Sequence, residues 1–283
     1  MIKAIVLDID GVIVGDQEGN NFPHPNEKIR SVLRKIHDDG IPVSFLTAKP
    51  AFAAAENIKY VGIDNPHIAD GGATIFNPLK NQIIHRTPVA EKDILPLLAS
   101  LPKQTYVSLF GINEYYMKSD MNQEFTTRYA KIFERLPIIT DDIEAVIKKE
   151  SIMKVNIVAF DDQQKESITN IITNLKGPYS FKWATHPFIK PIHVMVVTAK
   201  GISKRSGVEY LAKYLNVPFS EILAVGDTIQ DWDFMEICGY KAAMGNASAD
   251  LKEKIDIHDA NQMIGGDVNK DGLLDIFKHF NLI

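Results

Sequence analysis

The chain has 283 residues, which is enough for one large domain or two modest ones with buried cores. Its 31 Lys and Arg are outnumbered by 36 Asp and Glu, and the formal net charge of -5 excludes a broad basic field for nucleic acid or an acidic membrane. Cys238 is the single cysteine, so no disulfide can form within the chain, and no run of 18 apolar residues predicts a membrane span. We therefore expect a cytoplasmic protein whose partner is a small molecule; its oligomeric state stays open.

The N-terminal part of the chain predicts strands that alternate with helices. Apolar runs at residues 4–7, 42–46 and 66–69 are typical of buried strands. Between them, apolar residues at helical spacing predict helices over 26–39 and 51–60. Strands that alternate with helices favour right-handed crossovers and a parallel sheet.

The middle of the chain, over residues 86–190, has a different pattern. It predicts a separate α+β unit with an antiparallel sheet, because strands and helices no longer alternate regularly. The expected strands are 104–110, 152–160 and 179–184, and the expected helices are 90–101, 123–135 and 163–175.

Regular alternation returns toward the C-terminus, with a helix at 204–215, a strand at 221–225 and a helix at 229–237. The predicted architecture is a Rossmann-like parallel-sheet core, of the α/β class, formed by residues 1–85 and 191–283. An α+β cap domain over 86–190 is inserted into this core.

Polar residues follow the predicted core strands, at the sheet edge where open α/β sheets bind ligands. Gly11 allows the backbone to approach an anion closely, and Thr47 and Ala48 offer a hydroxyl and free amides. The clusters are Asp8-Ile9-Asp10-Gly11-Val12, Thr47-Ala48-Lys49, Lys200-Gly201-Ile202-Ser203-Lys204 and Gly226-Asp227-Thr228-Ile229-Gln230-Asp231.

Phosphoryl transfer needs the groups that these clusters supply. Magnesium prefers oxygen ligands such as carboxylates, and a lysine, a hydroxyl and backbone amides stabilise the charge on the transferred group. One carboxylate can act as nucleophile while a second carries protons. Each cluster alone could be a turn, a helix cap or a surface charge. Their order and their common place after strands predict a magnesium-dependent phosphoryl-transfer site.

These motifs resemble those of the haloacid dehalogenase superfamily, and specifically its Cof-type sugar-phosphatase branch. The resemblance covers about residues 1–85 and 191–283. It implies that Asp8 is the nucleophile, that Asp10 is the general acid and base, and that the hydroxyl of Thr47 binds phosphate. It also implies a phosphate-binding role for Lys204, with Lys200 as a nearby competitor.

The fourth motif of the family matches Asp227 and Asp231, with Asp227 as the more direct magnesium ligand. The resemblance thus implies a metal site formed by Asp8, Asp10, Asp227 and Asp231. The stretch Ala243-Met244-Gly245-Asn246-Ala247 also resembles this branch. Two positions depart from its pattern: Gln230 replaces a usual Asn that touches substrate, and Gly71-Gly72-Ala73 replaces Asn-Gly-Ala. The expected phosphate and substrate contacts are Gly11, Thr47, Ala48, Lys204, Gln230, Asn246 and His186.

The cap domain is expected to select the substrate, since a lid closes over groups that the core cannot recognise. Its polar and aromatic candidates are Lys154, Trp183 and His186. The expected function is hydrolysis of a small phosphorylated metabolite, such as a sugar or polyol phosphate, through an aspartyl phosphate. Two alternatives stay open: a phosphomutase, and a non-enzymatic receiver-like phosphoprotein.

One further segment, Asp267-Val268-Asn269-Lys270-Asp271-Gly272, imitates the start of a calcium-binding loop. The twelfth position of such a loop should be a bidentate Glu, and here it is Lys278. We therefore expect a polar turn that leads into a terminal helix over 273–280.

Overall fold

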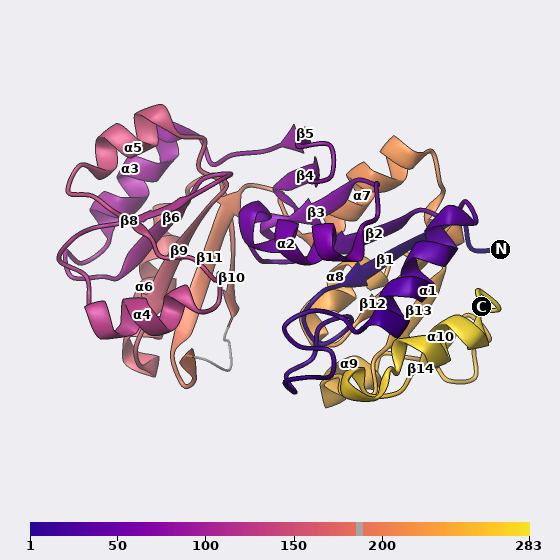
Figure 1. Ribbon diagram of the computed structural model, residues 1–283. Coiled ribbons are helices and arrows are strands. Elements are labelled where there is room, and N and C mark those ends of the chain that lie inside the picture. The colour runs from indigo at the N-terminus through magenta and orange to yellow at the C-terminus, as the bar shows by residue number, and fades with distance from the viewer. Residues whose placement is uncertain (185–188) are drawn as a thin grey trace. The chain divides into compact units, whose positions relative to one another are not determined.

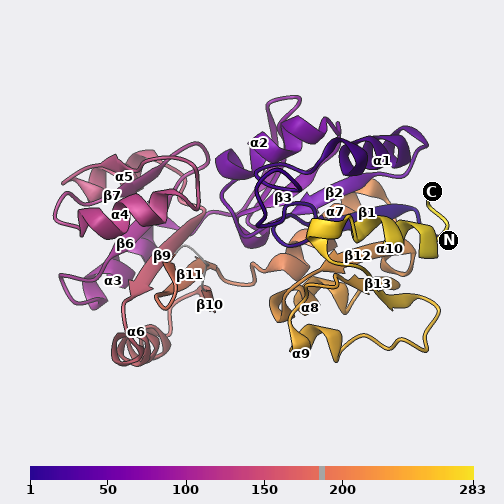
Figure 2. The same cartoon turned by 60° about the horizontal axis from the view of Figure 1, so that its bottom comes forward.

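The computed structural model describes residues 1–184 and 189–283, and they form two compact units (Figure 1 and Figure 2). The first unit comprises residues 1–48, 54–85 and 203–283. The second comprises residues 49–53 and 86–202. The chain therefore leaves the first unit and returns to it.

The first unit is built on a sheet with the strand order β14-β13-β12-β1-β2-β3-β4-β5. Its central strand β1 pairs in parallel with β2 and with β12, and parallel pairing continues outward to β3 and to β14. The predicted parallel-sheet core is confirmed. The strands are β1 (Ala4–Asp8), β2 (Val43–Leu46), β3 (His67–Ala69), β4 (Thr74–Asn77), β5 (Gln82–Arg86), β12 (Ile222–Gly226), β13 (Tyr240–Ala243) and β14 (Gln262–Ile264).

Helices cover both faces of this sheet, so its central strands are buried on both sides. α7 and α8 pack on the face that carries Ala4, Val6 and Ala224, while α1 and α10 lie on the other face (Figure 1). The helices of this unit are α1 (Glu27–Asp38), α2 (Ala51–Val61, whose first residues group with the second unit), α7 (Lys204–Leu215), α8 (Trp232–Met235), α9 (Ala249–Lys252) and α10 (Leu273–His279).

The second unit has a sheet with the order β10-β11-β9-β6-β7-β8, antiparallel except for the β7–β8 pair. α3, α5 and α6 pack on one face, and an aromatic cluster that includes residues of α4 covers the other. The elements are α3 (Glu91–Ser100), β6 (Val107–Phe110), β7 (Tyr115–Met117), α4 (Gln123–Ala130), β8 (Ile138–Ile139), α5 (Ile143–Lys149), β9 (Lys154–Ala159), α6 (Asp162–Leu175), β10 (Tyr179–Ala184) and β11 (His193–Ala199).

The return of the chain to the first unit differs from the predicted boundary. The sequence placed it at residue 191, but residues 191–202 belong to the second unit. The reason is β11, which pairs antiparallel with both β9 and β10 and so completes the sheet of the inserted unit. The first unit resumes only at Ser203, directly before α7.

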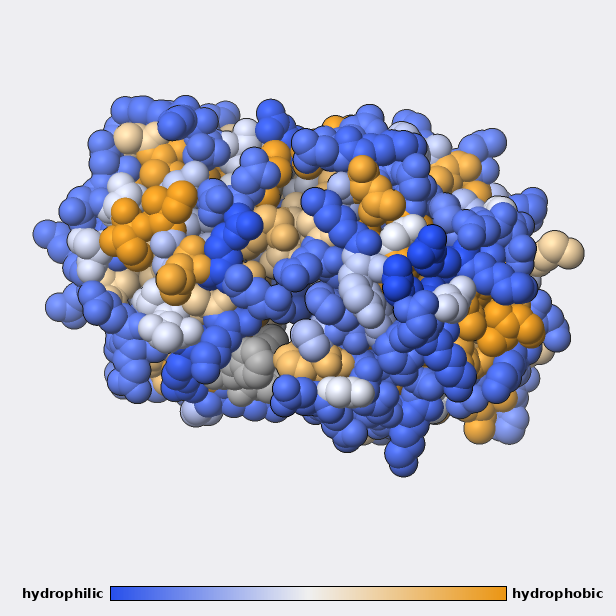
Figure 3. All heavy atoms as spheres, viewed as in Figure 1, coloured by the Kyte–Doolittle hydropathy of each residue, from blue (hydrophilic) through white to orange (hydrophobic). Residues whose placement is uncertain are grey.

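Hydrophilic residues cover most of the face drawn in Figure 3, and hydrophobic residues occur there in small groups. The exposed large hydrophobic residues include Leu136, Ile138 and Ile139 around β8. Among the helices in the described part of the chain, none combines the length and the apolar character that crossing a bilayer would require.

Candidate active site

Acidic side chains of the first unit meet at the carboxyl edge of the parallel sheet. Asp8 ends β1, and Asp227 follows β12, which pairs with β1 in parallel. Because the carboxyl ends of parallel strands share one edge, the two side chains come together. One carboxylate oxygen each from Asp8, Asp227 and Asp231 lies within 4.8 Å of the others. The structure therefore brings together these three residues that the sequence singled out.

Lys204 lies inside this acidic cluster. Its Nζ is 3.2 Å from Oδ1 of Asp8 and 2.6 Å from Oδ1 of Asp231. The whole residue is only 4% exposed, so solvent screens these ion pairs weakly. Lys200, the competing candidate, is exposed and belongs to the second unit. The geometry thus favours Lys204 for the phosphate-neutralising role.

Asp231 has partners for both of its carboxylate oxygens. Oδ1 faces Lys204, and Oδ2 accepts hydrogen bonds from the backbone N–H groups of Asp227 (3.0 Å) and Thr228 (2.9 Å) and from the Thr228 hydroxyl (3.2 Å). Such saturation suits a residue that orients Lys204 and the turn after β12 better than a direct metal ligand. The sequence did not identify Thr228, which contributes both a backbone and a hydroxyl donor.

Asp227 differs from Asp231 because its Oδ1 is buried and has no hydrogen-bond partner. Gly11, with φ of +79°, packs against the same carboxylate, and a Cβ at Gly11 would lie 2.1 Å from Oδ2. A buried carboxylate oxygen without a donor is costly unless a cation binds it. Three carboxylates beside one ammonium also leave the cluster with excess negative charge. Asp8 and Asp227 therefore fit the oxygen-ligand chemistry of magnesium.

The pKa values of the three carboxyl groups also distinguish Asp8 and Asp227 from Asp231. Burial raises the pKa of Asp8 to about 7, although Lys204 acts in the opposite direction. Burial, followed by the charge of Asp8, raises the pKa of Asp227 to about 8. For Asp231, burial is outweighed by Lys204 and by the backbone donors, so its pKa is lowered. The carboxyl groups with raised pKa are thus Asp8 and Asp227, and added positive charge there would keep them ionised.

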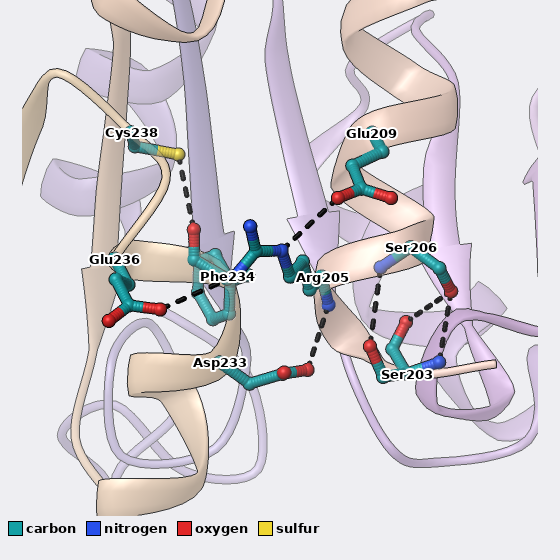
Figure 4. A network of polar contacts seen from close by, with 8 residues as sticks. All are labelled: Ser203, Arg205, Ser206, Glu209, Asp233, Phe234, Glu236 and Cys238. Atoms are coloured by element: carbon teal, nitrogen blue, oxygen red, sulfur yellow. Dashed lines mark hydrogen bonds and ion pairs between the residues drawn. The ribbon is translucent and has the colours of Figure 1, made fainter. Parts of the chain in front are cut away.

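A polar network fixes the helix that carries Lys204 (Figure 4). Ser203 caps α7 in a reciprocal pair with Ser206, in which each side chain bonds the backbone N–H of the other. The backbone N–H of Arg205 donates to Asp233 (2.9 Å), and its guanidinium contacts Glu209 and Glu236. The N-terminus of α7 is thereby fastened to α8, which follows directly after Asp231.

The turn after β3 supports the same helix end. Gly72 has φ of +112°, and a Cβ there would lie 2.0 Å from the carbonyl oxygen of Ser203. The N–H of Gly71 donates to the carbonyl of Thr47 (3.1 Å). The Gly71-Gly72 pair, in which Gly71 replaces the usual Asn of the family pattern, therefore lies between Thr47 and the residue before Lys204.

We expect Gly72→Ala to lower turnover, because the added methyl must displace the backbone of Ser203 and with it Lys204. Gly71→Ala is the matched control: Gly71 also has positive φ (+65°), but nothing lies within 4 Å of its Cβ position. The control should lose only about 1 kcal/mol of stability to backbone strain. Steady-state kinetics and thermal unfolding of both variants test this, and equal turnover in the two would contradict it.

The remaining site residues predicted from the sequence differ in their burial and in their contacts. Thr47 is buried directly after β2, Asp10 is partly buried in the loop after β1, and Ala48 and Gln230 are exposed. Asn246 hydrogen-bonds the backbone of Gly11 and of Val268. His186 lies outside the described residues.

The segment that imitates a calcium loop has structural contacts instead. The Oδ1 of Asp271 accepts hydrogen bonds from the amides of Asn26 (2.7 Å) and Asn21 (3.4 Å). The carboxylate of Asp267 accepts from the N–H of Asn269 (2.8 Å). These bonds fasten the segment to the loop that precedes α1, as expected of a polar turn.

Comparisons with known proteins identify the family of the chain. Residues 5–277 match the family model for haloacid dehalogenase-like hydrolases. A putative phosphatase of Haemophilus influenzae is 26% identical over 288 residues, which covers 96% of each chain. The structure of BT1666 from Bacteroides thetaiotaomicron, described among phosphatases of this superfamily, has 24% identity and a TM-score of 0.79 and covers 100% of this chain and 96% of its own. That of BT4131, described as a subclass IIB sugar phosphatase, has 17% identity and a TM-score of 0.74 and covers 99% and 100%.

The family match spans nearly the whole chain, and the neighbouring structures share its fold over their full length. The predicted resemblance is confirmed at the level of the family, and the phosphatases among the relatives agree with the predicted enzyme class. The chain belongs to the haloacid dehalogenase-like hydrolase family and is an enzyme of the phosphatase type.

Proposed function

We propose that the chain is a magnesium-dependent phosphatase that hydrolyses a small phosphorylated metabolite by way of an aspartyl phosphate, an acyl phosphate on Asp8. The observation that carries this proposal is the meeting of Asp8, Lys204 and the unpartnered oxygen of Asp227 at the sheet edge. It combines a nucleophile, a fixed positive charge and a place for a divalent cation.

In the first step, Oδ of Asp8 attacks phosphorus while the bond from phosphorus to the leaving oxygen breaks. The carboxyl of Asp10, two residues on, gives its proton to that oxygen, so that a neutral alcohol leaves. Lys204 neutralises charge on the phosphoryl oxygens and on Asp8. The Thr47 hydroxyl and the backbone at Ala48 bind the phosphate.

In the second step, water attacks the phosphorus of the aspartyl phosphate, and Asp10 takes its proton. The bond from Asp8 to phosphorus breaks, inorganic phosphate forms, and the Asp8 carboxylate is restored. Asp231 does not react. It holds Lys204 and the turn after β12 in position through its hydrogen bonds to the Lys204 ammonium and to the N–H of Asp227.

Asp8 and Asp227 are the residues proposed to hold magnesium, which when bound supplies positive charge for the phosphoryl oxygens. Hydrolysis is favoured over phosphoryl transfer to a second sugar because the family is one of hydrolases. A sugar or polyol phosphate is the proposed substrate class, supported by the description of BT4131 as a sugar phosphatase. Screening phosphorylated metabolites for phosphate release, with and without magnesium, tests this function; no release from any of them would contradict it.

Metal binding should also change stability, with a pH dependence of predictable sign. The pKa values of Asp8 and Asp227 rise from an ordinary value of 3.8 to about 7 and about 8 in the fold. The folded state therefore retains protons that the unfolded state has lost, and the stability contributed by this retention falls as pH rises from about 4 to about 8. Magnesium competes with those protons, so its stabilising effect should grow over the same interval.

The measurement is the melting temperature with chelator and with magnesium, at about pH 5.5 and about pH 8.5. We expect a larger magnesium-dependent rise at the higher pH, and none in Asp227→Asn. In activity assays, chelator should abolish turnover and magnesium should restore it. A metal-independent melting temperature at both pH values, together with full turnover in chelator, would overturn the proposed metal site.

A further inference from the structure

The loop after β1 turns tightly upon its own backbone. The carbonyl of Ile9 accepts hydrogen bonds from the N–H groups of Ile13 (3.0 Å) and Val14 (2.9 Å), and the N–H of Gly11 donates to the carbonyl of Val14 (2.7 Å). Asp10 lies within this loop. The position of its carboxyl therefore depends on how the loop as a whole is anchored.

Asn246 anchors the loop at Gly11, the residue next to Asp10. Its Nδ2 donates to the carbonyl of Gly11 at 2.9 Å, and its Oδ1 accepts from the N–H of Val268 at 2.8 Å. One partner is an acceptor and the other a donor, so only one orientation of the amide satisfies both. The side chain bridges two backbones more than 230 residues apart in the sequence.

The backbone around Asn246 is itself fixed to the turn that carries Asp227. The N–H of Ser248 donates to the carbonyl of Asp227 (2.8 Å), and the N–H of Gly245 donates to the carbonyl of Gly266 (2.7 Å). Through its side chain, Asn246 thus connects the loop that contains Asp10 to the turn that carries Asp227.

A second asparagine, Asn21, bonds the backbone of the same residue, Val268, at its carbonyl. Nδ2 of Asn21 donates to the carbonyl of Val268 at 2.7 Å, while the carbonyl of Asn21 accepts from the N–H of Gly15 at 2.7 Å. Through Asn246 and Asn21, both ends of the loop, at Gly11 and at Gly15, are tied by hydrogen bonds to Val268, which is 4% exposed. The segment that imitates a calcium loop therefore helps to hold the loop after β1 in place.

We propose that Asn246 is a positioning residue for Asp10, acting through the Gly11 carbonyl. This rests on the proposed function, in which Asp10 carries the proton in both steps. The sequence resemblance suggested a substrate contact for Asn246; in the structure its amide nitrogen and oxygen each bond a backbone group. Loss of the tie frees the Gly11 peptide to rotate, and the carboxyl of Asp10 then spends less time aligned with the leaving oxygen or with water.

The signature of this role is a selective loss of proton transfer. Nitrophenolate leaves without a proton, so formation of the phosphoenzyme from nitrophenyl phosphate does not need Asp10, whereas its hydrolysis does. Asn246→Ala and Asn246→Asp should raise the ratio of the first-turnover rate to the steady rate by about 10-fold, the range for losing one or two hydrogen bonds that orient a catalytic group. Because only the second step is slowed, kcat/KM for nitrophenyl phosphate should stay near the wild-type value, and KM should not rise.

The variants differ in a useful way. Asn246→Asp keeps the acceptor for Val268 but replaces the donor to Gly11, so it isolates that contact if Asn246→Ala folds poorly. Asn20→Ala is the matched control: its side chain donates to the carbonyl of Asn269 in the same C-terminal segment and is not among the partners of Gly11. The control should show the wild-type ratio. An equal rise of the ratio in Asn20→Ala would overturn the proposal.

Rapid mixing with nitrophenyl phosphate distinguishes a failure of the positioning role from a failure of the proposed function. If Asp10→Asn shows a fast first turnover and Asn246→Asp keeps the wild-type ratio, the positioning role is wrong while the proposed function stands. A raised KM with an unchanged ratio assigns Asn246 to substrate binding and also overturns the proposal. Normal steady turnover of a sugar phosphate by Asp10→Asn contradicts the part of the proposed function that gives Asp10 the proton-transfer role.

Discussion

Replacing Lys204 with methionine should lower turnover by about 100-fold or more, the range for deleting one preorganised electrostatic group. The methionine keeps most of the apolar stem, so the change removes chiefly the ammonium that lies 3.2 Å from Asp8 and 2.6 Å from Asp231. Without it, the phosphoryl oxygens approach two uncompensated carboxylates. Lys200→Met is the matched control, because Lys200 is an exposed residue of the second unit, and its turnover should stay near wild type.

The same substitution should destabilise the fold, since Asp231 is fully buried and would lose its counter-ion. A double variant, Lys204→Met with Asp231→Asn, removes that orphaned charge while it keeps an oxygen for the donors at Asp227 and Thr228. It should melt at a higher temperature than the single variant and yet remain inactive. Recovery of turnover in the double variant would show that Lys204 serves the fold and not the chemistry.

The site was predictable from the sequence wherever it depends on local pattern. Apolar runs that end in Asp8, Thr47 and Asp227 indicate buried parallel strands, and parallel strands must bring their carboxyl ends to one edge. The start of α7 at Lys204 was equally local, because apolar residues at helical spacing follow it. Short-range pattern therefore suffices to assemble the acidic cluster.

Contacts between distant segments were not predictable in the same way. Nothing in the sequence near Asn246 indicates that its amide bridges Gly11 and Val268, because hydrogen-bond partners depend on tertiary packing. The helix expected over 229–237 is divided at residue 231, since the Asp231 carboxylate accepts from the turn before it and keeps residues 229–231 in a tighter helical turn. The hydrogen bonds of Asp231 distinguish it from Asp227, whose Oδ1 has no partner in the described structure.

The second unit was predicted less completely for a related reason. β7 and β8 have only three and two residues, which is too short for a periodic pattern to appear. α4 ends at Ala130 although a helix was expected to 135, and the Phe133 side chain packs on Phe110 and Tyr115 beyond that end. Aromatic packing therefore overrides local helical preference there.

Exchanging the two acids of Asp8-Ile9-Asp10 for amides should give opposite kinetic results. Asp8→Asn should show no burst of nitrophenolate and no turnover, because the amide is not a nucleophile toward phosphorus. Asp10→Asn should show a burst that approaches one equivalent per active site and then a slow phase, because the phosphoenzyme forms but water lacks a base. With a sugar phosphate, Asp10→Asn should give little burst, since a sugar alkoxide does not leave without a proton.

The two variants are matched in size and charge change, so any difference between them reflects position in the site. Asp8 is the more buried of the two and pairs with Lys204, so Asp8→Asn also removes a charge partner from the cluster. Thermal unfolding and equilibrium binding of a non-hydrolysable phosphate analogue establish that each variant is folded and binds ligand. Given both, a burst of equal size in Asp8→Asn would exclude covalent catalysis at Asp8. Near-normal steady turnover of a sugar phosphate by Asp10→Asn would move the proton-transfer role to another residue.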